Sequence, residues 1–400
     1  MSSKKVLEGV RVLDFGRFIA APYCGMILAD MGAEVIRIDR PGGEEDRTVG
    51  LKAPNGENLS YPSYARNKKC ISLNVLSKDA PRDVLEDLVK KSDVFLHNFS
   101  PGAIKAFGLT YDDIKAIKPD IIYTGISCYG ATGPYSDRVG FDQIAQTFSG
   151  AAALTGYEGD DPLRSGLPWV DYSTALCATV GTLLALRHHD STGEGQMVDC
   201  ALLQTAMSFI APMVAEAVVM GKEKPRIGNR SPYFGPTDLY KCSDGFVYIA
   251  TTMEGMWRRL MKIIGHEDFV GKEGFVTDIE RFDNRDQVDP LVAEWISQHE
   301  VEEVVAIMDE NRIPCGVYHS TAEVADDPHV KARKMLEYMN LGMPGYENVP
   351  VCGLPIQLSK TPGEVKNVAP TVGQHNDEYY RELLGYSEEK IQELTESGFI

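Results

Sequence analysis

The amino-acid sequence predicts an α/β fold, in which helices cover a parallel sheet, together with a smaller α+β domain. The first observation is a regular alternation of short apolar strands and helices over the first 200 residues. The second is a change after residue 220, where a polar segment precedes a β-hairpin pattern. The third is length, because 400 residues exceed one compact core and favour two domains.

The chain opens with a βαβ pattern. Alternating and apolar residues predict strands over 10–15 and 34–39, and the segment between them predicts a helix over 20–31. This arrangement is similar to the start of a dinucleotide-binding fold. The loop before the helix, however, carries only Gly16 where the phosphate-binding motif Gly-x-Gly-x-x-Gly has three glycines. A Rossmann-like fold is therefore predicted without NAD as its ligand.

The same alternation continues to residue 220. Because parallel strands are joined by crossover helices, the pattern predicts a parallel, doubly wound sheet. The expected strands are 70–75, 93–97, 120–127 and 196–200. The expected helices are 80–91, 172–188 and 201–220, and a further helix is expected to end at residues 114–118.

A polar segment with proline and glycine, 221–232, separates this pattern from a different one. Residues 238–251 predict a β-hairpin that turns at Asp244 and Gly245. Helical patterns follow, so this part predicts a small α+β domain. The expected helices are 254–264, 287–299 and 301–311, and a short acidic helix is expected over 387–397.

Composition and charge disfavour several classes of protein. The net charge of −18 argues against nucleic acid and anionic membranes as partners, and no apolar run reaches the roughly 20 residues that cross a bilayer. Residues 1–8 lack the apolar region of a signal peptide. The eight cysteines are scattered without a Cys-x-x-Cys pair. We therefore expect a cytoplasmic protein with reduced thiols and no metal site.

One acidic residue stands directly before a long apolar segment. Asp171 precedes a run rich in alanine and leucine that extends to Leu186. Carboxylates are uncommon beside so much apolar surface unless they are capped, paired or functional. Taken alone, the segment predicts that Asp171 is the N-cap of a helix, because aspartate accepts hydrogen bonds from first-turn amides. A catalytic carboxylate is the alternative, and the two roles are compatible.

Ordered motifs along the chain point to one family. They are the segment that ends at Asp14, His-Asn-Phe-Ser-Pro-Gly over 97–102, Gly-Phe-Asp-Gln over 140–143, and the Asp171 helix. In order and spacing they resemble the family III CoA-transferases, the group of formyl-CoA and carnitine CoA-transferases. Residues 230–236 lack the glycine run of formyl-CoA transferases and are more similar to the carnitine branch. An acyl group larger than formyl or oxalyl is therefore expected.

The resemblance implies that Asp171 is a covalent nucleophile. Its carboxylate attacks the thioester of an acyl-CoA donor, forming an aspartyl anhydride and then an aspartyl-CoA thioester. A free carboxylic acid then takes the CoA. No general base is expected, because a carboxylate is already ionised at neutral pH. Coenzyme A is thus part of the substrate, and no permanently bound cofactor is expected.

The resemblance also implies a set of ligand contacts. Arg40 matches a contact to a CoA phosphate, with a solvated basic surface as the alternative, and Lys105 is displaced by one residue from an arginine of the family. Tyr61 and Tyr233 are expected to line the substrate pocket, and aromatic packing explains each equally well. The positions implied to bind CoA are Arg40, Asn98, Phe99, Lys105, Val139, Gly140, Phe141 and Asp142.

The family fold implies a homodimer of two interlocked rings. Both chain ends, 1–205 and 330–400, are expected to form a large Rossmann-like CoA-binding domain. Residues 206–236 are expected to be a linker, and 237–329 a small α+β domain. The expected partners are an acyl-CoA, a small carboxylic acid and a second copy of the chain.

Two other functions remain open. One is that of an α-methylacyl-CoA racemase or epimerase, although Phe141 stands where those racemases carry histidine and cannot exchange a proton. The other is that of an acyl-CoA-binding protein without catalytic activity.

Overall fold

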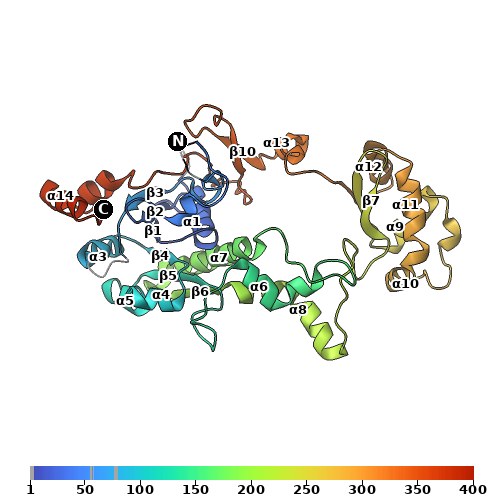
Figure 1. The fold of residues 1–400 in the computed structure, drawn as a ribbon, viewed down its shortest axis with the longest axis horizontal. Helices are drawn as coiled ribbons and strands as arrows, with labels where there is room; N and C mark the ends of the chain where they lie inside the picture. Colours follow the sequence, from blue (N-terminus) through green and yellow to red (C-terminus); the bar gives the residue numbers. More distant parts are fainter. Residues whose placement is uncertain (1–3, 55, 57, 76–79) are drawn as a thin grey trace. The chain divides into compact units, whose positions relative to one another are not determined.

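The computed structural model describes residues 4–54, 56, 58–75 and 80–400 (Figure 1). The sequence of residues 1–8 predicts no signal peptide, and the first three of these residues lie outside the described residues. The chain forms two compact units. The first consists of Met1–Ala151, Arg164–Ala211 and Pro328–Ile400, and the second of Ala152–Leu163 and Pro212–Asp327.

In the described part of the first unit, six parallel strands form one sheet. They are β1 (Arg11–Asp14), β2 (Glu34–Asp39), β3 (Lys69–Ser72), β4 (Val94–His97), β5 (Ile122–Ser127) and β6 (Met197–Ala201). Their order in the sheet is β3-β2-β1-β4-β5-β6. This is the doubly wound order, which reverses between β1 and β4. The predicted parallel α/β architecture is confirmed.

Helices cover both faces of this sheet. They are α1 (Ala20–Asp30), α2 (Pro62–Ala65), α3 (Arg82–Lys90), α4 (Pro101–Ala106), α5 (Tyr111–Ile117), α6 (Asp142–Ser149), α7 (Trp169–Thr192) and α14 (Glu388–Glu396). A further helix of this unit, α13 (Pro328–Ala332), has no buried residue. α1 and α7 pack in an apolar cluster with Val12 of β1, whereas α3, α4, α5 and α14 pack in a second cluster with Leu13. The side chains of adjacent strand residues therefore point to opposite faces of the sheet, as in any pleated strand.

The carboxyl-terminal segment of the chain returns to this unit. It contains the antiparallel strands β10 (Leu336–Met339) and β11 (Val349–Cys352), followed by a π-helical turn over Asp377–Leu383. Tyr380 of that turn is buried, and its hydroxyl donates to the carbonyl of Ser72 at 2.6 Å. The two ends of the chain thus share one core.

The second unit is built on a three-stranded antiparallel sheet. Its strands are β7 (Thr237–Lys241), β8 (Phe246–Ala250) and β9 (Cys315–Val317), in the order β7-β8-β9. The predicted β-hairpin is therefore confirmed. Trp257 is fully buried in the core between the sheet and its helices. These helices are α9 (Glu254–Ile263), α10 (Asp278–Asp283), α11 (Asp289–Ser297) and α12 (Val301–Glu310).

Helix α8 (Leu202–Met220) begins in the first unit and continues into the second at Pro212. Most of it falls in the segment 206–236, which we expected to be a linker. By length and composition, α7 and α8 could each cross a membrane, so the length argument against a membrane span does not hold for them. α7 nevertheless has the contacts of a core helix, because Ala175 and Ala178 are fully buried in the cluster with α1.

Candidate active site

A cavity of about 300 Å³ lies at the carboxyl ends of β1, β4 and β5. The strand order of the sheet reverses there, which is the place where doubly wound sheets bind ligands. Three loops, which follow β1, β4 and β5, supply its wall together with residues of β5 and of four helices. The lining residues are Arg17, Phe18, Ile19, Ala20, Asn98, Phe99, Ser100, Ala103, Ile126, Ser127, Cys128, Arg138, Val139, Gly140, Phe141, Asp171 and Leu202.

Asp171 lies in the first turn of α7, and Asp142 caps that turn. The Oδ2 atom of Asp142 accepts hydrogen bonds from the amides of Val170 at 2.8 Å and Asp171 at 3.2 Å. The prediction that Asp171 is itself the N-cap is therefore wrong. Gln146 holds the cap in place, because its Nε2 atom donates to Oδ1 of Asp142 at 2.5 Å. The Asp171 side chain is thereby left to line the cavity.

The environment of Asp171 disfavours its charged form. Burial, and secondly the negative charge of Asp142, raise the pKa of Asp171 to about 7. The expectation of a carboxylate with an ordinary low pKa is thus corrected, because the raised pKa lies close to neutral pH. A poorly solvated carboxylate is also the more reactive one, since little hydration opposes its attack.

Other nucleophiles in the cavity are less suited to the chemistry. Burial, and secondly the charge of Asp171, raise the pKa of the Cys128 thiol to about 11, so this thiol is protonated at neutral pH. The hydroxyls of Ser100 and Ser127 accept hydrogen bonds from backbone amides. Among the described residues that line the cavity there is no histidine or lysine to act as their base. Asp171 is therefore the best candidate.

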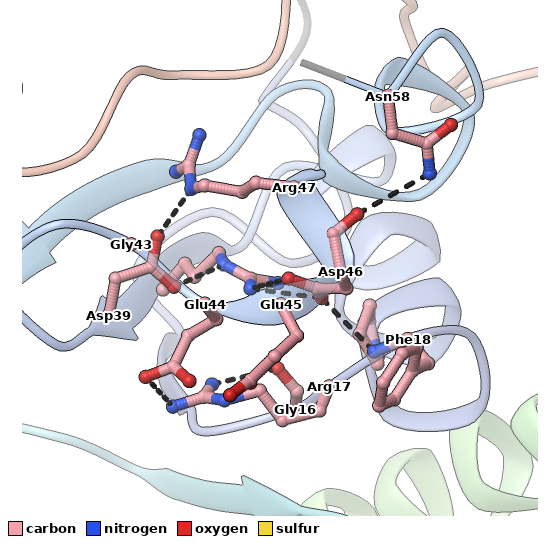
Figure 2. A network of polar contacts seen from close by, with 12 residues as sticks. Gly16, Arg17, Phe18, Asp39, Gly43, Glu44, Glu45, Asp46, Arg47 and Asn58 are labelled. Carbon is pink, nitrogen blue, oxygen red and sulfur yellow. Dashed lines mark hydrogen bonds and ion pairs between the residues drawn. The ribbon is translucent and has the colours of Figure 1, made fainter. Parts of the chain in front are cut away.

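The loop after β1 is clamped from two sides. The amide of Arg17 donates to Oδ1 of Asn98 at 2.8 Å, and Nδ2 of Asn98 donates to the carbonyl of Arg17 at 2.7 Å. On the other side, the amide of Phe18 donates to Oδ2 of Asp46 at 3.0 Å (Figure 2). Phe18 has a φ of 60°, a left-handed conformation that a bulky residue rarely adopts. These contacts hold the loop in the cavity wall.

A buried ionic network supports this clamp (Figure 2). Arg37 donates to Asp39 at 2.7 Å and to Asp46 at 2.8 Å, and Arg47 donates to Asp39 at 2.6 Å. The Tyr61 ring lies 5.3 Å from the Arg37 guanidinium and 4.6 Å from that of Arg47. The structure thus places Tyr61 inside the network, where its packing against two cations accounts for its burial.

The other predicted site residues are distributed as follows. Arg40 is half-exposed and donates to Glu45 at 2.6 Å. Lys105 lines a neighbouring cavity of about 390 Å³, and Tyr233 lies in the second unit, where its hydroxyl bonds to Glu216. The residues that the structure brings together around the first cavity are Asn98, Phe99, Val139, Gly140, Phe141 and Asp171, with Asp142 directly beneath Asp171.

Gly140 allows the 138–141 loop to approach the end of β5. A Cβ atom at this position would lie 2.5 Å from Sγ of Cys128, which is closer than real contacts allow. Eleven lining residues were not singled out by the sequence, among them Arg17, Phe18, Cys128 and Arg138. Their positions after predicted strands could have identified them, because the carboxyl ends of parallel strands meet at one edge of a sheet, where ligands bind.

The neighbouring cavity contains a buried histidine. His97 lines this cavity, and its Nδ1 atom accepts from the amide of Phe99 at 3.2 Å. Burial lowers the pKa of His97 to about 3, so its ring is neutral. No group of three or more potential metal ligands occurs among the described residues.

Comparisons with known proteins agree on one family. The family model for CoA-transferase family III matches residues 7–376. Succinyl-CoA–D-citramalate CoA-transferase from Chloroflexus aurantiacus is 32% identical over 97% of this chain and 96% of its own. Succinyl-CoA:glutarate CoA-transferase from Homo sapiens is 31% identical over 100% of this chain and 91% of its own. The crystal structure of a CAIB/BAIF family protein from Brucella suis has a TM-score of 0.83 at 29% identity, covering 95% of this chain and 99% of that one.

The fold and the cavity thus define an α/β protein with its ligand site at the switch point of a doubly wound sheet. The chain belongs to CoA-transferase family III.

Proposed function

We propose that this protein transfers CoA from a dicarboxylyl-CoA donor, such as succinyl-CoA, to a free carboxylic acid. Three relatives with similarity over at least 97% of the chain are named for succinyl-CoA and for citramalate, malate or glutarate. The observation that carries the proposal is Asp171, a carboxylate of raised pKa in the wall of the switch-point cavity.

The reaction proceeds by exchange on two carbonyl groups. An oxygen of Asp171 attacks the donor thioester carbonyl, the carbon–sulfur bond breaks, and CoA leaves as a thiolate. The thiolate attacks the aspartyl carbonyl of the resulting anhydride and releases the donor acid, which leaves an aspartyl-CoA thioester. An acceptor carboxylate repeats both exchanges in reverse and regenerates the Asp171 carboxylate. No net proton is consumed, so no general base is needed.

Each exchange develops negative charge on a carbonyl oxygen. Helix α1 begins at Ala20, and both Ile19 and Ala20 line the cavity. First-turn amides of a helix have no acceptor within the helix and carry partial positive charge. We therefore assign the amino-terminal end of α1 as the site that stabilises the oxyanion.

The pH dependence follows from the ionisation of Asp171. Because the charged form is the nucleophile, kcat/KM should fall about tenfold per pH unit below pH 7 and level off above it. Asp142→Asn keeps an oxygen that can cap α7 but removes the neighbouring charge, so the midpoint should move to lower pH. The matched control is Asp190→Asn at the exposed end of α7. An unshifted midpoint in Asp142→Asn would contradict the electrostatic role of Asp142.

An exchange assay tests the function itself. The wild-type protein, given succinyl-CoA and a labelled carboxylic acid, should form the labelled acyl-CoA and free succinate in equal amounts, with the total thioester conserved. Thioester hydrolysis without exchange, or no reaction at all, would refute transfer. Entry of solvent deuterium at the α-carbon without CoA exchange would instead support a racemase. Phe141 lines the cavity but cannot accept or donate a proton, so a racemase would have no second proton-transfer group at this position.

We also propose that the protein is a cytoplasmic homodimer of interlocked rings. Apolar side chains on α7 and α8 are exposed in the single chain, including Val180, Leu184 and Phe209, and a second copy would cover such surface. The eight cysteines are all free thiols, which is typical of a reducing compartment. Sedimentation velocity should give the mass of a dimer, and a monomer at micromolar concentration would contradict this assembly.

A further inference from the structure

The charged side chains that line the Asp171 cavity have different partners. Among the described residues, three charged side chains line it: Arg17, Arg138 and Asp171. Arg17 is engaged, because it donates to Glu44 at 2.8 Å and to the carbonyls of Phe15 and Gly16. Its guanidinium is therefore neutralised and committed to holding its own loop.

Arg138 differs from Arg17 in each of these respects. Its side chain is exposed, and its guanidinium makes no hydrogen bond or ion pair with any residue that the structure describes. The guanidinium carbon lies 3.9 Å from the centre of the Tyr135 ring, and its backbone amide donates to the carbonyl of Tyr135 at 2.9 Å. Stacking on an aromatic ring orients a guanidinium while leaving its N–H groups available for a ligand.

We propose that Arg138 binds the distal carboxylate of the dicarboxylyl group and so determines the preference for dicarboxylic over monocarboxylic substrates. The inference rests on the proposed function, because it concerns the acyl group that Asp171 exchanges. A second carboxylate entering this cavity meets the charge of Asp171 and needs a cation to offset its lost hydration. A guanidinium also matches a carboxylate through two parallel hydrogen bonds.

The position of Arg138 favours a carboxylate over a CoA phosphate. Arg138 shares its loop with Val139, Gly140 and Phe141, and all four line the same cavity as the nucleophile. The arginine that we assigned to a CoA phosphate is Arg40, which directly follows β2 and is not among the residues that line this cavity. The acyl end and the phosphate end of the substrate thus have separate cations.

Two donors that differ only in the distal carboxylate test this assignment. Succinyl-CoA and butyryl-CoA have the same four-carbon chain. In Arg138→Gln, kcat/KM for succinyl-CoA should fall about 10- to 100-fold, whereas that for butyryl-CoA should stay within about twofold of wild type. Arg138→Lys should restore part of the loss, because it retains the charge without the paired hydrogen bonds. The matched control is Arg258→Gln, which removes an exposed arginine of the second unit.

The outcomes separate this inference from the proposed function. An equal loss with both donors would assign Arg138 to a part of CoA common to both and would overturn the inference. Unchanged kcat/KM for succinyl-CoA in Arg138→Gln would overturn it as well. If wild type transfers CoA from neither donor, the proposed function itself fails, whatever the variant does.

Discussion

Asp171→Asn is expected to lower the rate of CoA transfer by about a thousandfold or more while acyl-CoA binding is retained. Asparagine has nearly the shape of aspartate, so the cavity and the cap of α7 by Asp142 should persist. Its amide nitrogen is not a nucleophile, and no anhydride can form. The measurement is kcat with succinyl-CoA and an acceptor acid, together with CoA binding by calorimetry. Asp190→Asn on the same helix is the matched control.

A stability measurement separates lost chemistry from lost fold in this variant. The pKa of Asp171 in the folded protein, about 7, lies above the value of about 3.9 for an unfolded chain. Between these values the folded state binds more protons, so the contribution of Asp171 to stability falls as the pH rises from about 4 to 7. Asp171→Asn avoids this cost and should melt above wild type at pH 8, with a smaller difference near pH 4. A large fall of Tm at pH 8 would mean that the variant is simply misfolded.

Asp39→Asn is expected to produce the largest loss of stability, about 3–5 kcal/mol. Asp39 is fully buried and accepts from Arg37 at 2.7 Å and from Arg47 at 2.6 Å. Removing its charge leaves the buried positive charge of two guanidinium groups insufficiently compensated, and breaking a buried pair costs more than the pair contributed. The measurement is the free energy of unfolding from urea denaturation at pH 7.

A control in the segment after β2 distinguishes burial from simple charge loss. Glu45→Gln breaks the exposed pair with Arg40 and should cost less than about 1 kcal/mol. Burial acts to raise the pKa of Asp39, but the guanidinium groups of Arg37 and Arg47 outweigh it and lower this pKa overall. Its stabilisation is therefore present above pH 4 and is lost as the pH falls through the folded-state pKa. Equal costs for the two variants would contradict the role of the buried network.

Locally encoded elements of the fold were predictable from sequence. β2 occupies the predicted residues 34–39, and α1 begins at Ala20 as expected, because apolar periodicity and terminating glycines are local signals. β9 was not predicted: its three residues pair with β8, which lies more than 60 residues away. The short helix α6 was missed as well, since a mixed eight-residue segment gives little periodicity.

In the candidate site, too, features that depend on neighbouring residues could be predicted, and features that depend on distant residues could not. The segment that places Asp171 on an apolar helix was evident from the residues around it. Its cap was not, because the cap is Asp142, which lies 29 residues away along the chain. Its raised pKa was not either, because it depends first on burial in the folded protein and secondly on the charge of Asp142. Tyr61 likewise could be recognised as an aromatic residue, but its place between Arg37 and Arg47 depends on how the loop after β2 folds back.

Peptide mass spectrometry after hydroxylamine quenching tests the central claim most directly. The protein is incubated with succinyl-CoA or with buffer alone, and hydroxylamine then traps an activated carboxyl group as a hydroxamate. Covalent catalysis predicts a hydroxamate on Asp171 that requires acyl-CoA and that is absent from Asp142, which is directly beneath it. An unmodified Asp171 in a preparation that transfers CoA at its normal rate would contradict the covalent role of this residue.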